Sequence, residues 1–122
     1  MNTQDCLYTI NEREGAGFAP IIVGAIRKAV FFPQAREELL EIARSKELKL
    51  ITLTVSEKAY QCNSARDGIN LSSTEVQADI ADVNSLLTFP ARLLDLLVAR
   101  FESGLPGVAV ISCDNLPTNG DI

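Results

Sequence analysis

Two short apolar segments, residues 48–55 (LKLITLTV) and residues 108–111 (VAVI), constrain the fold more than any other feature of this sequence. Neither segment shows the clean alternation of polar and apolar residues that is typical of a strand with one face in solvent. Strands covered on both faces are found in parallel sheets with helices packed on either side. We therefore predict an α/β fold of three layers with a mostly parallel sheet.

The clearest predicted helix runs over residues 89–103, between these two strands. Thr88 precedes its first residue, Pro90 lies in its first turn and Gly104 follows its last residue, and these residue types mark helix ends in that order. Its apolar residues recur at helical spacing. We expect the buried stripe of this helix to consist of Leu94, Leu97, Val98 and Phe101.

Two further helices are predicted from signals of the same kind. Pro33 is placed to open one helix, in which apolar residues recur at helical spacing with Glu and Arg on the opposite face. Ser72 and Glu75 have the spacing of a capping box, and the apolar residues of segment 76–83 follow with the spacing of a short helix. Helices therefore alternate with strands along the chain.

The first 26 residues are predicted to contain two strands and a loop. Residues 6–10 (CLYTI) predict a short strand, residues 11–20 (NEREGAGFAP) predict a loop, and residues 21–26 (IIVGAI) predict a buried strand. Gly24 marks a bulge or a close backbone approach in that strand. The GAGFAP segment precedes a strand, whereas a dinucleotide-binding loop follows one and opens a helix, so we predict no phosphate site there.

The composition excludes several classes of function. A net charge of −5 with scattered Lys and Arg argues against nucleic acid as a partner, because phosphate binding needs a basic face. No His is present, which removes the usual general base and the commonest metal ligand, and we predict no metal site. Three separated cysteines indicate free thiols in a reducing compartment. With no signal peptide or membrane span predicted, we expect a cytoplasmic protein.

Polar segments follow both apolar strands directly. If the strands are parallel, these segments meet at one edge of the sheet, the edge at which open α/β sheets bind ligands. Asn115 could there stabilise an oxygen that gains negative charge, and Glu57 could relay a proton or contact a cofactor. The alternatives stay open: Asp114 and Asn115 could make an Asx turn or a cap, and Glu57 could be a solvated charge at a helix start.

The segments LTVSEKAYQCNS and VISCDNLPTNG resemble the polyol-specific long-chain dehydrogenases, the family of mannitol 2-dehydrogenase and the fructuronate and tagaturonate reductases. Members typically carry a strand followed by T-E-K-G-Y, and later S-C-D-N-x-x-x-N-G. The matching positions here are residues 56–60, residues 112–115 and the Asn119–Gly120 pair. Ser56 and Ala59 depart from the pattern, and Ala59 places a Cβ where the family has glycine. The resemblance covers nearly the whole chain.

The resemblance implies a Rossmann-type domain that binds NAD, with NADP as the other option. It implies hydride transfer between this cofactor and a sugar alcohol or aldonate, giving the keto-sugar or keto-uronate. Asn115 would be half of an oxyanion hole and Glu57 would lie beside the reacting centre. The cofactor-binding positions implied by the two motifs are Thr54, Ser56, Glu57, Lys58, Cys113, Asp114 and Asn115.

Two parts of the family pattern are not found in this sequence. No Gly-rich strand-to-helix turn precedes Cys6, and no K-x-x-x-x-N-x-x-H signature is present, because Arg66 stands where the His would follow Lys58 and Asn63. We expect residues 1–122 to be a single domain, the C-terminal part of a cofactor domain without its first Gly-rich βα unit and without a substrate domain. Exposed sheet edges would favour self-association. The alternative is a non-catalytic α/β subunit or binding module derived from the family.

Overall fold

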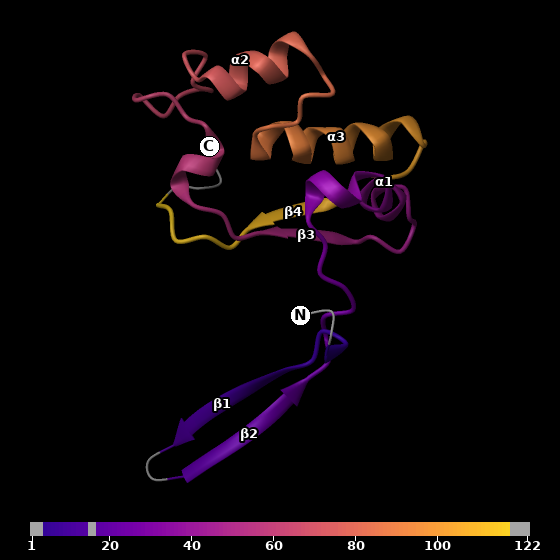
Figure 1. Cartoon of the computed structure of the whole chain (residues 1–122), viewed down its shortest axis with the longest axis vertical. Helices are drawn as coiled ribbons and strands as arrows, with labels where there is room; N and C mark the ends of the chain where they lie inside the picture. Colours follow the sequence, from indigo (N-terminus) through magenta and orange to yellow (C-terminus); the bar gives the residue numbers. More distant parts are fainter. Residues whose placement is uncertain (1–3, 15–16, 118–122) are drawn as a thin grey trace. The chain divides into compact units, whose positions relative to one another are not determined.

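The computed structural model describes residues 4–14 and 17–117 and divides the chain into two compact units, residues 1–36 and residues 37–122 (Figure 1). Each unit contains one two-stranded sheet. The order of the elements is β1 (Tyr8–Glu14), β2 (Gly17–Val23), α1 (Phe32–Ala43), β3 (Leu50–Leu53), η2 (Glu57–Tyr60), α2 (Thr74–Ala81), α3 (Phe89–Glu102) and β4 (Ala109–Ser112).

The first sheet is an antiparallel hairpin of β1 and β2, with a register that runs from Tyr8 opposite Val23 to Glu14 opposite Gly17. The predicted loop over residues 11–20 is therefore wrong, because its described residues belong to the two strands. Pro20 is tolerated there because a strand of a two-stranded ribbon has one edge that needs no N–H donors. The charged and Gly-rich composition that indicated a loop is compatible with such an exposed ribbon.

The predicted buried strand over residues 21–26 is also wrong. Strand β2 ends at Val23, and the Ile22 side chain is 74% exposed. The close approach predicted at Gly24 is confirmed, because a Cβ on Gly24 would lie 3.2 Å from Cδ2 of Leu7. A larger residue would therefore push against the segment that leads into β1.

In the second unit, β3 and β4 are parallel neighbours, as the sequence predicted (Figure 1). The register pairs Leu50 with Ala109 and Leu53 with Ser112. The pairing extends one residue further, because the N–H of Cys113 donates to the carbonyl of Leu53 at 2.7 Å. The polar segments that follow the two strands therefore leave the same end of the sheet.

Helix α3 begins at the predicted Phe89 and ends at Glu102, one residue before the predicted end. Thr88 is its N-cap and accepts a hydrogen bond from the N–H of Ala91, Pro90 lies in the first turn, and Gly104 beyond the helix has a positive φ of 67°. The predicted buried stripe is wrong, because Leu94, Val98 and Phe101 are exposed, Phe101 to 81%. The buried positions of α3 are Ala99 and Arg100 instead.

The same correction applies to the strands, which were predicted to be covered on both faces. Leu50, Val110 and Ile111 are exposed. In the part of the chain that the structure describes, neither β3 nor β4 pairs with a third strand. A two-stranded sheet with helices of this length leaves apolar side chains in solvent, although their sequence pattern is that of a buried sheet.

Arg100 is buried, at only 4% exposed, although charged residues are seldom buried unless they are paired. Its Nε donates to the carbonyl of Pro106 at 2.8 Å, and its Nη1 donates to the carbonyls of Ala43 and Ser45 at 3.0 and 2.9 Å. The Ala43 carbonyl is at the C-terminus of α1, where the helix dipole favours a cation. Arg100 thus joins α3 to the end of α1 and to the loop before β4.

Helix α2 has Ser73 as its N-cap, one residue later than the predicted Ser72. The Ser73 hydroxyl accepts from the N–H of Val76 and donates to the Glu75 carboxylate at 2.8 Å. Glu75 is therefore the second residue of the helix, where a capping box has its acidic residue at the third. The predicted helix itself is confirmed, although it ends at Ala81 and leaves Val83 outside.

Asp79 of α2 holds the start of α3. Its carboxylate accepts hydrogen bonds from the N–H groups of Leu87 and Thr88 at 2.8 and 2.9 Å, and from the Thr88 hydroxyl at 2.7 Å. Burial raises the pKa of Asp79, but these hydrogen bonds together lower the pKa by more than burial raises it. The pKa of Asp79 therefore lies below its ordinary value. Across residues 4–14 and 17–117, no helix has the length and apolar character needed to cross a membrane.

Candidate functional site

The candidate site lies at the end of the sheet where β3 and β4 finish. Glu57 is the first residue of the short helix η2, which begins four residues after Leu53, and Asn115 follows Ser112 of β4 by three residues. Both side chains are exposed. The expectation that the two polar segments share one sheet edge is confirmed by the parallel pairing, whereas the roles of the two residues stay predictions.

A hydrogen-bonded triangle joins the two segments. The Tyr60 hydroxyl, at the end of η2, donates to Oδ2 of Asp114 at 2.5 Å and lies 2.7 Å from Oγ of Ser112. The Ser112 hydroxyl donates to the same Asp114 oxygen at 2.9 Å. A carboxylate oxygen can accept two such bonds, and hydrogen bonds to an ionised group are stronger than neutral ones. The triangle therefore fastens η2 to the end of β4.

The pKa of Tyr60 is raised above its ordinary value of 10.0. The hydrogen bond to Asp114 is the main cause, because ionising the phenol would bring a second negative charge against the carboxylate, whereas the bond with Ser112 acts in the opposite direction. The Tyr60 ring packs edge-to-face on Phe89 of α3, with ring centroids 6.3 Å apart and planes at 78°. Tyr60 is thus held at both its ring and its hydroxyl.

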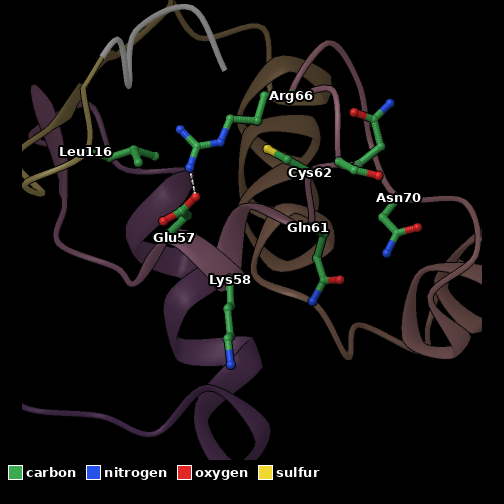
Figure 2. Close-up of a pocket in the computed structure, with 9 residues that line it drawn as sticks. Glu57, Lys58, Gln61, Cys62, Arg66, Asn70 and Leu116 are labelled. Carbon is green, nitrogen blue, oxygen red and sulfur yellow. Dashed lines mark hydrogen bonds and ion pairs between the residues drawn. The ribbon is translucent and has the colours of Figure 1, made fainter.

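A polar hollow of about 720 Å³ opens beside these residues (Figure 2). Inside it the Arg66 guanidinium donates to the Glu57 carboxylate, and the two form an ion pair. Lys58 extends away from that pair, and Leu116 points toward it (Figure 2). The side chains that line the hollow are those of Glu57, Lys58, Gln61, Cys62, Asn63, Ser64, Arg66, Asn70 and Leu116.

The hollow owes its shape to a tight turn between η2 and α2. Gln61 and Arg66 have positive φ values of 55° and 58°, conformations that non-glycine residues adopt rarely. The Asn63 N–H donates to the Gly68 carbonyl at 2.9 Å, and the Asn63 amide donates to the Asp67 carboxylate at 2.8 Å. This turn, predicted around Asp67–Gly68, places Arg66 against Glu57.

The other predicted cofactor-binding residues lie along the same rim. Thr54 and Ser56 connect β3 to η2 and are exposed, as are Lys58 and Cys113. Asp114 is half-buried and bonded to Tyr60 and Ser112. The Asn119–Gly120 pair lies outside the described residues. Ala59 adopts an ordinary conformation within η2, so its Cβ is accommodated where the family pattern has glycine.

Sequence reasoning missed three residues of this region. Tyr60 and Ser112 occur in the two quoted motifs, and the shared strand ends were the signal that could have paired them. Arg66 follows Glu57 by nine residues in a turn and offers no spacing that indicates the ion pair. For metals, the described residues contain no group of three His, Cys, Asp or Glu side chains that could hold an ion, and the absence of a metal site stays a prediction.

Comparisons with known proteins extend over almost the whole chain. The sequence is 32% identical over 123 residues to a mannitol 2-dehydrogenase of Pyricularia oryzae, covering 98% of this chain and 24% of that protein. It is 31% identical over 124 residues to a mannitol 2-dehydrogenase of Aspergillus oryzae, covering 100% of this chain and 25% of that protein. No protein-family model matches the chain.

The fold superposes on two solved structures. One is a substrate-free D-sorbitol dehydrogenase, with a TM-score of 0.87 and 26% identity over 98% of this chain and 25% of the other. The second is the Pseudomonas fluorescens mannitol 2-dehydrogenase with NAD and D-mannitol, with a TM-score of 0.84 and 27% identity over 98% of this chain and 24% of the other. Over nearly its whole length this chain is similar to polyol dehydrogenases.

The predicted resemblance to the polyol dehydrogenases is therefore confirmed, and so is the α/β fold class. The chain spans about a quarter of the length of the curated relatives that it matches. Those relatives are polyol dehydrogenases, so the similarity does not favour the alternative of a non-catalytic binding module.

Proposed function

We propose that this chain is part of a nicotinamide-dependent oxidoreductase that interconverts a sugar alcohol or aldonate with the corresponding keto-sugar or keto-uronate. The main support is the parallel pairing of β3 and β4, which brings Glu57 and Asn115 to one sheet edge. A relative that superposes on 98% of this chain contains NAD and D-mannitol. The edge at which these polar segments lie is where open α/β sheets bind dinucleotides.

The chemistry of the rim fits one end of a nicotinamide nucleotide. The hollow carries a carboxylate, two cations and several amides, groups that complement ribose hydroxyls and the carboxamide of nicotinamide. This sequence has no Gly-rich turn that could bind a pyrophosphate, so we assign these residues to the nicotinamide half of NAD or NADP. The residues that would hold it are Thr54, Ser56, Glu57, Lys58, Cys113, Asp114 and Asn115.

In this proposal the cofactor, when bound, accepts or supplies the hydride. Asn115 donates an amide N–H to the substrate oxygen, which gains negative charge as hydride is transferred, and a preorganised donor of this kind lowers the barrier. Glu57, paired with Arg66, keeps a carboxylate in the lining of the hollow, where it accepts or passes on a proton through water. The resemblance implies a Lys as the general acid, in a signature that these 122 residues do not match.

A chimera tests the proposal directly. In the Pseudomonas fluorescens mannitol 2-dehydrogenase, the quarter of the chain that matches would be replaced by the present sequence. We expect NAD-dependent oxidation of mannitol or of a related polyol. In this chimera Asn115→Ala should lower kcat by about 10²–10³-fold, the usual cost of removing one oxyanion donor. Asn84→Ala is the matched control, since Asn84 is exposed and bonds to Asp82, and it should leave kcat unchanged.

Two outcomes would count against the proposal. A chimera that has native circular dichroism and binds NAD, yet turns over neither polyols nor keto-sugars, contradicts the assigned function. A chimera that is active and equally fast with and without the Asn115 amide contradicts the role of that residue alone. The two failures are distinguishable because the first concerns every substrate and the second only one side chain.

Self-association is a second part of the proposal. Leu94, Val98 and Phe101 on α3 and Val110 and Ile111 on β4 are each exposed in the second unit. Association with a second copy would remove such apolar side chains from water. We expect the sedimentation coefficient of the 122-residue chain to rise with protein concentration, and Phe101→Glu to reduce that rise. A sedimentation coefficient independent of concentration would contradict this part of the proposal.

A further inference from the structure

Asn115 lies between a hydrogen-bonded residue, Asp114, and a residue that lines the hollow, Leu116. On its N-terminal side, Asp114 is hydrogen-bonded to Tyr60 and Ser112. On its C-terminal side, the half-buried Leu116 lines the hollow and points toward the Glu57–Arg66 pair (Figure 2). The sheet itself fixes the backbone only as far as Cys113, whose N–H bonds to Leu53. Beyond Cys113 the Asp114 side chain carries the connection back to η2.

We propose that Tyr60 is a positioning residue, whose hydroxyl, bonded to Asp114 and Ser112, fixes the segment that carries Asn115 at the rim of the hollow. Tyr60 and Asp114 are 54 positions apart in sequence, so this bond is a long-range tie between the two motif segments, in addition to the Tyr60–Ser112 contact and the Cys113–Leu53 bond. The inference rests on the proposed function for the role of Asn115, whereas the tie itself requires no cofactor.

The three contacts of the triangle share two hydroxyl protons, and Tyr60 is the member that belongs to η2. Tyr60 and Ser112 supply one hydroxyl proton each, and three contacts join the three side chains. Both protons point at Asp114 when each hydroxyl donates to the carboxylate. Removing the Tyr60 hydroxyl removes the hydrogen bond from η2 to Oδ2 of Asp114, whereas Ser112, which also donates to that oxygen, lies on the same strand end as Asp114. The hydrogen bond of Tyr60 that joins η2 to this segment is then lost.

The packing around Tyr60 allows the hydroxyl to be tested separately from the ring. Phe89, Pro90 and Leu93 of α3 contribute apolar side chains to the hollow of about 440 Å³ beside the ring. The titratable and charged groups that face Tyr60 are Asp114 across the triangle and Cys62, Arg66 and Asp67 along that hollow. Tyr60→Phe keeps the edge-to-face contact with Phe89 and removes only the oxygen.

The first test is residue-resolved amide hydrogen exchange on the full chain, with Tyr60→Phe compared with Tyr8→Phe. Tyr8 is the other tyrosine of the sequence and lies in β1. We expect Tyr60→Phe to speed exchange of the Cys113 amide by about three-fold or more, as expected for the loss of one hydrogen bond, and to shift the Asn115 side-chain amide resonances. The Ile111 amide within β4 and the Asn84 side chain should not change.

Exchange rates that are unchanged at Cys113, or that rise equally throughout β3 and β4, would overturn the proposal. The first result shows that the hydroxyl does not hold this segment, and the second shows a general loss of stability. Tyr8→Phe should leave both readouts unchanged, and an equal effect in this variant would also overturn the proposal.

The second test keeps Tyr60 and its hydrogen bonds, so it does not depend on whether Tyr60→Phe folds. In the Tyr8→Phe background, the ultraviolet absorbance of phenolate reports Tyr60 alone, because the sequence has two tyrosines. We expect the Tyr60 pKa to lie above 10.0 and to fall toward that value in Asp114→Asn. A pKa at or below 10.0, or one that Asp114→Asn does not lower, means that the tie is absent in solution.

These readouts separate the inference from the proposed function. Exchange and absorbance are measured without NAD or a polyol, so an inactive chimera with a normal Tyr60 response would contradict only the function. In an active chimera, Tyr60→Phe should lower kcat more than it raises KM, because Asn115 would be misplaced for the transition state rather than for binding. An active chimera indifferent to Tyr60→Phe in kcat, KM and exchange would overturn the inference alone.

Discussion

The guanidinium of Arg66 is paired with the carboxylate of Glu57 in the lining of the polar hollow, across a turn in which Arg66 has a positive φ of 58°. Both side chains are about half exposed, at 49% and 57%. The pair therefore organises charge at the proposed cofactor end of the sheet, while solvent screens most of its contribution to stability.

We predict a small coupling energy between Glu57 and Arg66. A double-mutant cycle of Glu57→Gln and Arg66→Gln, measured by urea unfolding, should give an interaction of about 0–1 kcal/mol, the range of exposed ion pairs. The interaction should shrink further when salt is raised, because the Debye length shortens. A coupling above about 2 kcal/mol would mean that the pair is desolvated in solution, contrary to the exposure of both side chains.

Arg100 should matter far more than any exposed arginine. Arg100→Met removes donors from the carbonyls of Pro106, Ala43 and Ser45, of which the bond to Ala43 is buried and the other two are part-buried. We expect the free energy of unfolding to fall by about 2–5 kcal/mol. The matched control is Arg44→Met, since Arg44 is exposed, and it should change stability by less than about 0.5 kcal/mol. Equal effects of the two substitutions on urea unfolding would contradict the buried role of Arg100.

Because of Asp79, the free energy of unfolding should depend on pH in the acid range. Its pKa is lower in the folded chain than the ordinary value of 3.8, so its contribution is fully present above that value and is lost as the pH falls through the folded pKa. Asp79→Asn should cost about 1 kcal/mol at pH 7, through weaker capping of α3. The difference between the two proteins should close below pH 3.8, as measured by thermal unfolding from pH 7 to pH 2.

Asp82→Asn provides a control for that experiment. Asp82 accepts from the N–H and side-chain amide of Asn84 in an exposed loop, and it has no contact with Thr88 in the hydrogen bonds described above. A gap between Asp79→Asn and the unsubstituted chain that is constant with pH would contradict the assignment of the acid dependence to Asp79.

The chain by itself should bind NADH weakly. The sequence has no Gly-rich strand-to-helix turn, so the binding energy of the pyrophosphate is missing even if the nicotinamide end fits. We expect no saturable change in NADH fluorescence on titration with the 122-residue chain, whereas the chimera should show one. Tight binding by the chain alone would mean that the cofactor lies elsewhere than at the rim of β3 and β4.

The sequence by itself was enough for the parts of the structure that depend on neighbouring residues. Thr88, Pro90 and Gly104 predicted the ends of α3, because caps and the first-turn proline act within a few residues. The apolar character of β3 and β4 predicted their parallel pairing, and parallel pairing placed the two motif segments at one edge. The two motif segments, LTVSEKAYQCNS and VISCDNLPTNG, predicted the similarity to the polyol dehydrogenases.

Only the tertiary structure decided which of these residues meet and which are buried. Composition cannot distinguish an exposed antiparallel ribbon such as β1–β2 from a charged loop, because both lack a buried face. Helical periodicity marked the apolar stripe of α3, yet Phe101 is exposed and Arg100 is buried, since burial depends on what packs against the helix. The contact of Tyr60 with Asp114 joins residues 54 positions apart, and such a contact follows from chain packing rather than from local pattern.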